Sequence, residues 1–342
     1  MWCKTLIALA VLLATALAVR AEGGAEAFGR GDFAAAAARF EAGAAAGDAT
    51  AQNNLGVLYL RGKGVTQDYD RAREQFEAAA RQHLPGAMFN LGMMYLRGYG
   101  MQAQPGVAAD WFGRAAALDD REAQFFLGVL LTRGDGVPAD PARAKALFLA
   151  AALAGLPAAQ FNLAMLYLDD PKPGEDEAAA LHWLEAAAKQ DYRRAKLHIA
   201  KLDLRHNDEP GRLEHAATLL RELADAGEPE AQMEFGLLNL FGKGLPKNED
   251  EGRFWLRQAA LQGLADAQVN LGAVYARGLG ITPDPAEAFA WLTLAAEQDP
   301  KARPALDAVA GKLSPSERSD ADARLSDLRV KVAEASTVTA TE

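Results

Sequence analysis

Hydrophobic residues recur along most of this chain at helical spacing, and the pattern repeats every 36 residues. Each copy opens with an alanine, counted here as position zero, and continues with apolar residues three or four positions apart, as in Leu55, Leu58 and Tyr59. This spacing predicts a first helix, and a second apolar helix follows before the next alanine. A fixed period of this length predicts an all-α solenoid of stacked helical hairpins. The opening alanines of repeats one to seven are Ala51, Ala87, Ala123, Ala159, Ala195, Ala231 and Ala267.

A glycine-rich turn joins the two predicted helices of most repeats. Gly62 and Gly64 follow the first helix of repeat one, and the same pair recurs in four other repeats. Glycine ends helices because it adopts the left-handed conformation without strain. Asp140 and Pro141 then give the second helix an N-cap and a first residue. A phosphate-binding loop is not predicted, because no Gly-Lys-Ser/Thr follows the glycines and no strand precedes them.

The predicted core combines small residues on the first helix with large residues on the second helix. A small residue follows the first leucine of the first helix, as at Gly56, and predicts close approach of a neighbouring helix. The second helix carries Phe76, Phe112 and Phe148 at one shared position. The tryptophans at the position just before it are Trp111, Trp183, Trp255 and Trp291. This regular recurrence predicts that both sets are core residues.

The first 21 residues have the features of a cleaved secretory signal. Lys4 supplies a positive charge, residues 5–19 are an apolar run, and Val19 and Ala21 are small residues at the positions that a signal peptidase reads. We therefore expect removal of residues 1–21 and a periplasmic or secreted protein. The run is shorter than the roughly 20 residues of a bilayer span, so no stable membrane span is expected after cleavage. An uncleaved anchor is the alternative.

Charge and cysteine content exclude some classes of function. The formal net charge is −10, and loss of Lys4 and Arg20 makes it two units more negative. Such an acidic protein is not steered to nucleic acid or to an anionic membrane surface. The only cysteine, Cys3, lies within the signal. The mature protein would therefore have no disulfide in an oxidising compartment, and its stability must come from packing.

The order A-x-x-x-L-G-x-x-Y-x-x-G-x-G-V, followed by a capped helix with A-x-x-W/F and A-A, resembles the Sel-one-like repeats, which are close relatives of tetratricopeptide repeats. The resemblance covers residues 51–302 as seven repeats, with 26–50 as a partial preceding repeat. It implies a right-handed α-solenoid of antiparallel helix pairs over residues 22–302. For residues 303–333 the sequence predicts two capping helices, and for residues 334–342 it predicts a disordered tail.

Repeats four and five depart from the pattern. Asp170 stands at the first glycine position of repeat four. In repeat five, Asp203 replaces the tyrosine, and His206 and Asp208 stand at the glycine positions. One interpretation is drift, since solenoid repeats tolerate local loss of pattern. The other is a change of curvature or a partner site over residues 169–212.

The residue inventory predicts a protein that is not an enzyme and holds no cofactor. No serine occurs before Ser314, and the mature chain has no cysteine, so neither nucleophile is available within the repeats. Paired cysteines accompany β-lactamase-like activity in some relatives, and this chain lacks them. A metal site is not predicted either, because no two histidines have the three- or four-residue spacing of a helical zinc motif. The histidines of repeats four and five are His182, His198, His206 and His215.

The resemblance implies a binding scaffold rather than a specific reaction. We expect a non-enzymatic adaptor, exported to the periplasm or the cell exterior, that binds another protein in envelope signalling or secretion. The alternative is a cell-wall or exopolysaccharide-associated factor that binds glycan or assists a glycan-processing enzyme.

By resemblance to tetratricopeptide arrays, positions two, six, nine and ten of the first helix should face the concave surface. Aromatic residues at position two and arginines at position ten would suit a segment with apolar and acidic residues. The candidate partner-binding residues are Arg61, Phe89, Arg97, Phe125, Arg133, Phe161, Arg205 and Arg277. Two alternatives need no partner. The phenylalanines could be core between repeats, and arginine in a last turn complements the helix dipole.

Overall fold

The computed structural model describes residues 23–169 and 175–339, so the expected signal of residues 1–21 lies outside the described residues. All regular secondary structure in the described ranges is helical. The chain divides into an N-terminal part, Met1–Trp183, and a C-terminal part, Leu184–Glu342.

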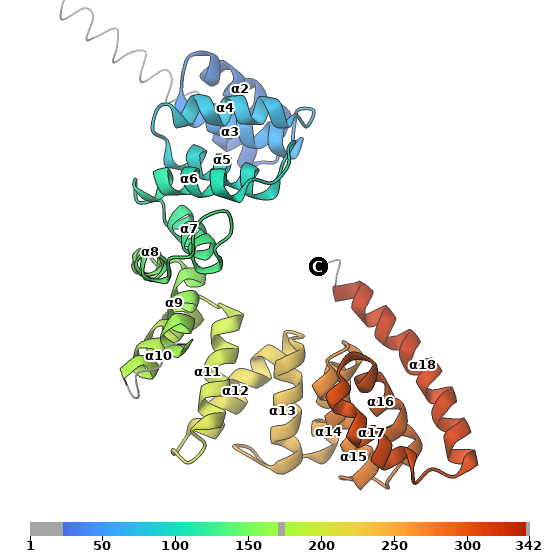
Figure 1. Ribbon diagram of the computed structural model, residues 1–342. Coiled ribbons are helices and arrows are strands. Elements are labelled where there is room, and N and C mark those ends of the chain that lie inside the picture. The colour runs from blue at the N-terminus through green and yellow to red at the C-terminus, as the bar shows by residue number, and fades with distance from the viewer. Residues whose placement is uncertain (1–22, 170–174, 340–342) are drawn as a thin grey trace, which may run out of the picture. The chain divides into compact units, whose positions relative to one another are not determined.

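The N-terminal part is a row of antiparallel helix pairs (Figure 1). A short helical segment over residues 23–29 precedes them. The first helices of repeats one to four are α3 (Ala49–Arg61), α5 (Pro85–Arg97), α7 (Arg121–Arg133) and α9 (Pro157–Asp169). The second helices begin with that of the partial repeat and are α2 (Phe33–Ala45), α4 (Tyr69–Ala80), α6 (Pro105–Ala116), α8 (Pro141–Leu153) and α10 (Glu175–Ala188). Helix α10 contains the division between the two parts.

The C-terminal part continues the same alternation. The first helices of repeats five to seven are α11 (Arg193–Arg205), α13 (Pro229–Phe241) and α15 (Ala265–Arg277). The second helices are α12 (Arg212–Asp225), α14 (Glu249–Leu261) and α16 (Pro285–Gln298). A 3-10 turn (Pro300–Ala302), α17 (Arg303–Ala310) and α18 (Pro315–Thr339) follow.

The Gly-x-Gly turns end the first helices as the sequence predicts. Gly62 is left-handed, with φ 62°, and its N–H bonds the carbonyl of Leu58. Gly64 is left-handed too, and a Cβ there would lie 2.2 Å from the carbonyl oxygen of Phe33. The first glycine therefore ends the helix, while the second lets the turn touch the preceding second helix.

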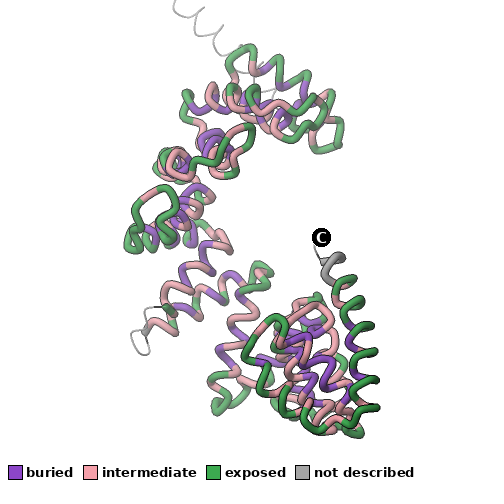
Figure 2. Tube along the Cα trace, turned by 45° about the vertical axis from the view of Figure 1, so that its right-hand side comes forward, coloured by how far each residue is buried: buried purple, intermediate pink, exposed green. Residues whose placement is uncertain are grey.

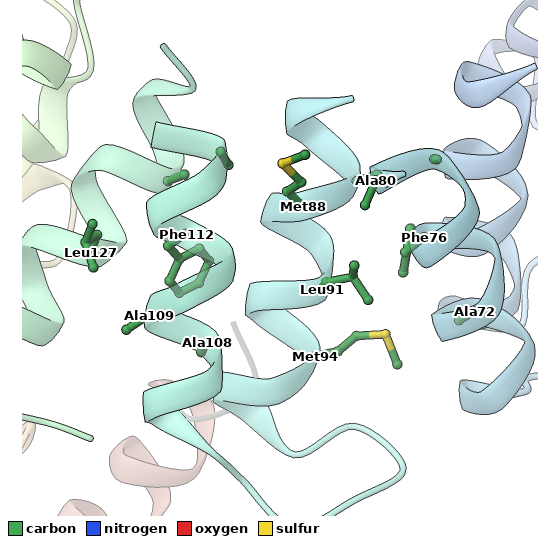
Figure 3. Packing of buried hydrophobic residues seen from close by; sticks show 14 of the residues in the cluster. Ala72, Phe76, Ala80, Met88, Leu91, Met94, Ala108, Ala109, Phe112 and Leu127 are labelled. Carbon is green, nitrogen blue, oxygen red and sulfur yellow. The ribbon is translucent and has the colours of Figure 1, made fainter. Parts of the chain in front are cut away.

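The core lies between the first and second helices, where small residues meet large ones (Figure 3). Phe76, Phe112 and Phe148 are fully or almost fully buried, as predicted. Figure 2 shows buried positions recurring along the helices, with the turns mostly exposed. Of the four tryptophans predicted to be core, Trp291 is fully buried, whereas the other three are half-buried and pack against the edge of the core. They stand one residue, or about 100° of helix rotation, from the buried position.

Helix α18 covers the end of the array by packing on α16 and α14. Leu325 and Leu328 are buried. Arg324 donates to Asp284, the N-cap of α16, at 2.6 Å and to Glu287 at 3.1 Å. The expected disorder of residues 334–342 is wrong over 334–339, because these residues continue α18; the last three lie outside the described residues.

Candidate functional site

Positions three, six and ten of each first helix lie on one side of it, because steps of three or four residues return to the same side of an α-helix. We call the side chains at these positions the A-face. All of them in the N-terminal part are half-buried or exposed. In repeats one to three they are Asn54, Val57, Arg61, Asn90, Met93, Arg97, Phe126, Val129 and Arg133.

A hollow of about 330 Å³ opens at the start of this A-face. Asn54, Val57 and Arg61 line one side of it, and the rings of Phe28 and Phe40 line the other. All three A-face positions of repeat one therefore face the same space.

The sequence places the position-two residues on the concave binding surface, whereas in the structure their rings pack against other rings of the core. The ring of Phe89 lies 5.7 Å from those of Phe112 and Phe126, and the ring of Phe125 lies 5.8 Å from that of Phe148. Phe161 is buried. The phenylalanines thus pack within and between repeats. The residues that share the arginines' side of the helix are those at position three. The role of the position-two residues in partner binding stays a prediction.

The arginines at position ten are all exposed, and each is the last residue of its helix: Arg61, Arg97, Arg133, Arg205 and Arg277. Within residues 23–169 and 175–339, none of these five forms an ion pair, whereas Arg73, Arg253 and Arg324 do. Complementing the helix end does not occupy a guanidinium's hydrogen-bond donors. The position-ten arginines therefore keep their planar forks available for an anionic group.

The A-face of the C-terminal part has a different composition. Repeat five presents His198, Lys201 and Arg205, and repeat six has Phe241 where an arginine would stand. Phe241 is 55% exposed, which is unusual for a large aromatic side chain. The A-face here combines charged groups with one exposed aromatic ring.

Burial shifts the pKa of two groups on this surface. It raises the pKa of the Glu234 carboxyl, an effect that Lys201 opposes and the carboxylates of Glu230 and Asp266 reinforce. Burial also lowers the pKa of His198, and the positive charge of Lys201 adds to that effect. Both groups thus favour their neutral forms more than they would in water.

The protein is a periodic helical scaffold. The family model for the Sel1 repeat matches residues 49–84, 85–120, 121–156, 157–192, 229–264 and 265–300. The chain belongs to the Sel1 repeat family. Proteins built from Sel1 repeats are generally protein-interaction scaffolds and are typically non-enzymatic. No curated protein matches this chain.

Solved Sel1 structures resemble this one along most of its length. A Sel1 repeat protein from Oxalobacter formigenes is 30% identical, with a TM-score of 0.61, over 86% of this chain and 90% of that one. A protective antigen present in uropathogenic Escherichia coli strains, which displays an SLR fold, is 27% identical, with a TM-score of 0.56, over 90% of this chain and 74% of that one.

The Sel1 match omits residues 193–228, which form repeat five and hold a buried charge cluster. The Asp203 side chain is fully buried on α11. Its carboxylate accepts a hydrogen bond from Nη1 of Arg212 at 2.8 Å and lies 2.7 Å from Nδ1 of His215. This cluster joins α11 to α12 where repeats one, two and seven have a tyrosine and a glycine turn. Whether it binds a partner stays a prediction.

A glutamine ladder also joins the Sel1 repeats, and its role was missed although the recurrence of glutamine at position one was visible. Each Nε2 donates to the carbonyl of an alanine eight residues earlier, at the end of the preceding second helix. The five donors are Gln52, Gln124, Gln160, Gln232 and Gln268. In repeats one, six and seven a further glutamine, Gln82, Gln262 or Gln298, donates to the amide oxygen of the first. The ladder is structural, since it satisfies buried polar groups.

No group of three or more His, Cys, Asp or Glu side chains in the described residues is placed to hold a metal ion. No described helix has the length and apolarity needed to cross a bilayer.

Proposed function

We propose that this Sel1 repeat protein is an exported adaptor that binds an acidic segment of another protein along the A-face of its N-terminal part. The observation that supports it most directly is the row of exposed arginines, Arg61, Arg97 and Arg133, without ion pairs in the described chain. Arginine binds carboxylates in a bidentate manner, and half-buried side chains such as Met93 offer adaptable apolar contact beside it.

Charge complementarity favours an acidic partner over other ligands. The protein as a whole carries −10, so this row is a local positive feature on an acidic molecule. A partner segment with spaced carboxylates would be oriented by the row, and its association would weaken as salt screens the charges.

The binding test uses Arg97→Glu with Arg133→Glu. The partner is first captured from envelope extract on the wild-type protein, then purified and titrated. Because both arginines are exposed, the variant should fold normally, while reversal of two charges should weaken binding by about tenfold or more. Arg81→Glu with Arg143→Glu, two exposed arginines at the end of α4 and within α8, makes the same change in net charge and should bind as wild type. Equal affinity of the A-face variant and wild type, or retention on peptidoglycan or exopolysaccharide without any protein partner, contradicts the proposal.

Export rests on the sequence of residues 1–21. The apolar run and the small residues before Glu22 support cleavage by a signal peptidase. We expect mass spectrometry of protein from the envelope fraction to find Glu22 at the mature N-terminus. Recovery of a chain that keeps Met1 in the cytoplasmic fraction would refute export.

A further inference from the structure

A hollow of about 510 Å³ with both polar and apolar lining lies in the C-terminal part, beside α12, α13 and the loop that leads into α14. Charged groups of both signs line it, namely Arg221 and Lys247 with Glu214 and Glu251. It sits away from the A-face, and none of the candidate binding residues lines it.

The repeat period shows what this hollow lacks. A second hollow, of about 400 Å³, lies 180 residues earlier in the chain, a spacing of five repeats. Every residue lining it has its repeat equivalent in the lining of the later hollow. The pairs are Glu41 and Arg221, Tyr59 and Asn239, Val65 and Leu245, Thr66 and Pro246, Asp68 and Asn248, and Arg71 and Glu251.

In the earlier hollow a tyrosine joins the two charged groups. The hydroxyl of Tyr59 lies 3.4 Å from Oε1 of Glu41 and 3.3 Å from Nη1 of Arg71. The Arg71 guanidinium also lies over the Tyr59 ring, at 5.5 Å from its centre. The phenol thus lies between two second helices and bridges a carboxylate and a guanidinium.

The sixth repeat keeps the charged pair but not the tyrosine. Repeat seven has Arg257, Tyr275 and Glu287 at these three positions, whereas repeat six has Arg221, Asn239 and Glu251. The Asn239 side chain is almost fully buried, and its Nδ2 donates to the carbonyl of Phe235 within the same helix.

The lost ring leaves space that the chain does not refill. The later hollow reaches Ala217 and Phe235, two buried residues whose equivalents do not line the earlier one. Loss of a large side chain from a packed site leaves a cavity of this kind, and such a cavity can accept an aromatic guest.

We propose that this hollow binds a tyrosine side chain supplied by an extended segment of a partner protein. The guest ring replaces the missing phenol, and its hydroxyl lies between Arg221 and Glu251, donating to the carboxylate and accepting from the guanidinium. A phosphate would meet Glu214 and Glu251, and a lysine would meet Arg221 and Lys247, so the mixed lining favours a neutral group that both donates and accepts. This inference rests on the proposed scaffold function, because it names a partner side chain.

The test titrates the full mature chain with N-acetyl-L-tyrosinamide and, separately, N-acetyl-L-phenylalaninamide, followed by NMR shifts. We expect the tyrosine amide to bind severalfold more tightly than the phenylalanine amide, because only it has the hydroxyl. Asn239→Tyr restores the repeat's own ring and should weaken binding at least about tenfold. Arg193→Tyr, at an exposed position at the start of α11, adds a tyrosine outside the hollow and should change nothing.

A second variant keeps the test decisive if Asn239→Tyr does not fold. Arg221→Ala removes an exposed side chain and should weaken the tyrosine amide severalfold while leaving the phenylalanine amide unchanged. No saturable binding of the tyrosine amide, equal binding of the two amides, or full binding by folded Asn239→Tyr overturns the inference. The titration uses no partner protein, so its failure is distinguishable from failure of the arginine-row experiment.

Discussion

Replacing Arg212 by methionine should lower the free energy of unfolding of the C-terminal part by roughly 3–5 kcal/mol, the usual cost of leaving a buried carboxylate without its partner. Asp203 has no exposed side-chain surface, and Arg212 approaches it at 2.8 Å. His215 alone would then face the carboxylate, and its own side chain is 56% exposed. Methionine keeps most of the apolar length of arginine, so the loss reports the charge rather than the packing.

Urea unfolding followed by tryptophan fluorescence measures this effect in chains that carry Trp111→Phe and Trp183→Phe, because Trp255 and Trp291 then report on the C-terminal part. Arg221→Met, on the exposed side of the same helix, is the matched control and should change stability little. Adding Asp203→Asn to Arg212→Met should recover much of the loss, because the buried anion is then gone. A single variant that unfolds at the wild-type urea concentration would show that Asp203 does not need Arg212.

The sequence predicted those features that depend on local backbone chemistry. The period, the helix ends at Gly62 and its equivalents, and the N-cap at Asp140 each follow from the preferences of one or two residues. The aspartate at the tyrosine position of repeat five was visible too. Its burial was not, because its partners lie nine and twelve residues away, on the next helix and beyond an irregular turn.

Side-chain direction was harder to predict than helix position. Recurrence identified both aromatic positions of the second helix but could not separate full from partial burial, since adjacent residues differ by about 100° around the axis. The same limit applies to position two of the first helix, whose phenylalanines pack against neighbouring rings while their role in partner binding stays a prediction. Position ten lies seven residues, or nearly two turns, from position three, so Asn90 rather than Phe89 shares the side of Arg97.

Gly92→Ala should destabilise the N-terminal part by roughly 1–3 kcal/mol, as overpacking of a filled core does. A Cβ on Gly92 would lie 2.5 Å from Cε1 of Phe112, closer than side-chain carbons approach. Alanine is the better helix former by up to ~1 kcal/mol, so intrinsic propensity alone predicts the opposite sign. Repeats one and three have the same arrangement, with Gly56 against Phe76 and Gly128 against Phe148.

Repeat five contains the compensated form of this contact. Ala200 and Leu220 stand at the two equivalent positions, and both are fully buried in one cluster. We therefore expect Phe112→Leu to restore most of the stability that Gly92→Ala removes, although Phe112→Leu alone loses buried ring contacts and should also destabilise. Chemical unfolding of both single variants and the double variant gives the coupling between them, which should be favourable by about 1 kcal/mol or more. If the two losses are strictly additive, Gly92 and the Phe112 ring are not energetically coupled, and close packing of the ring does not explain the glycine.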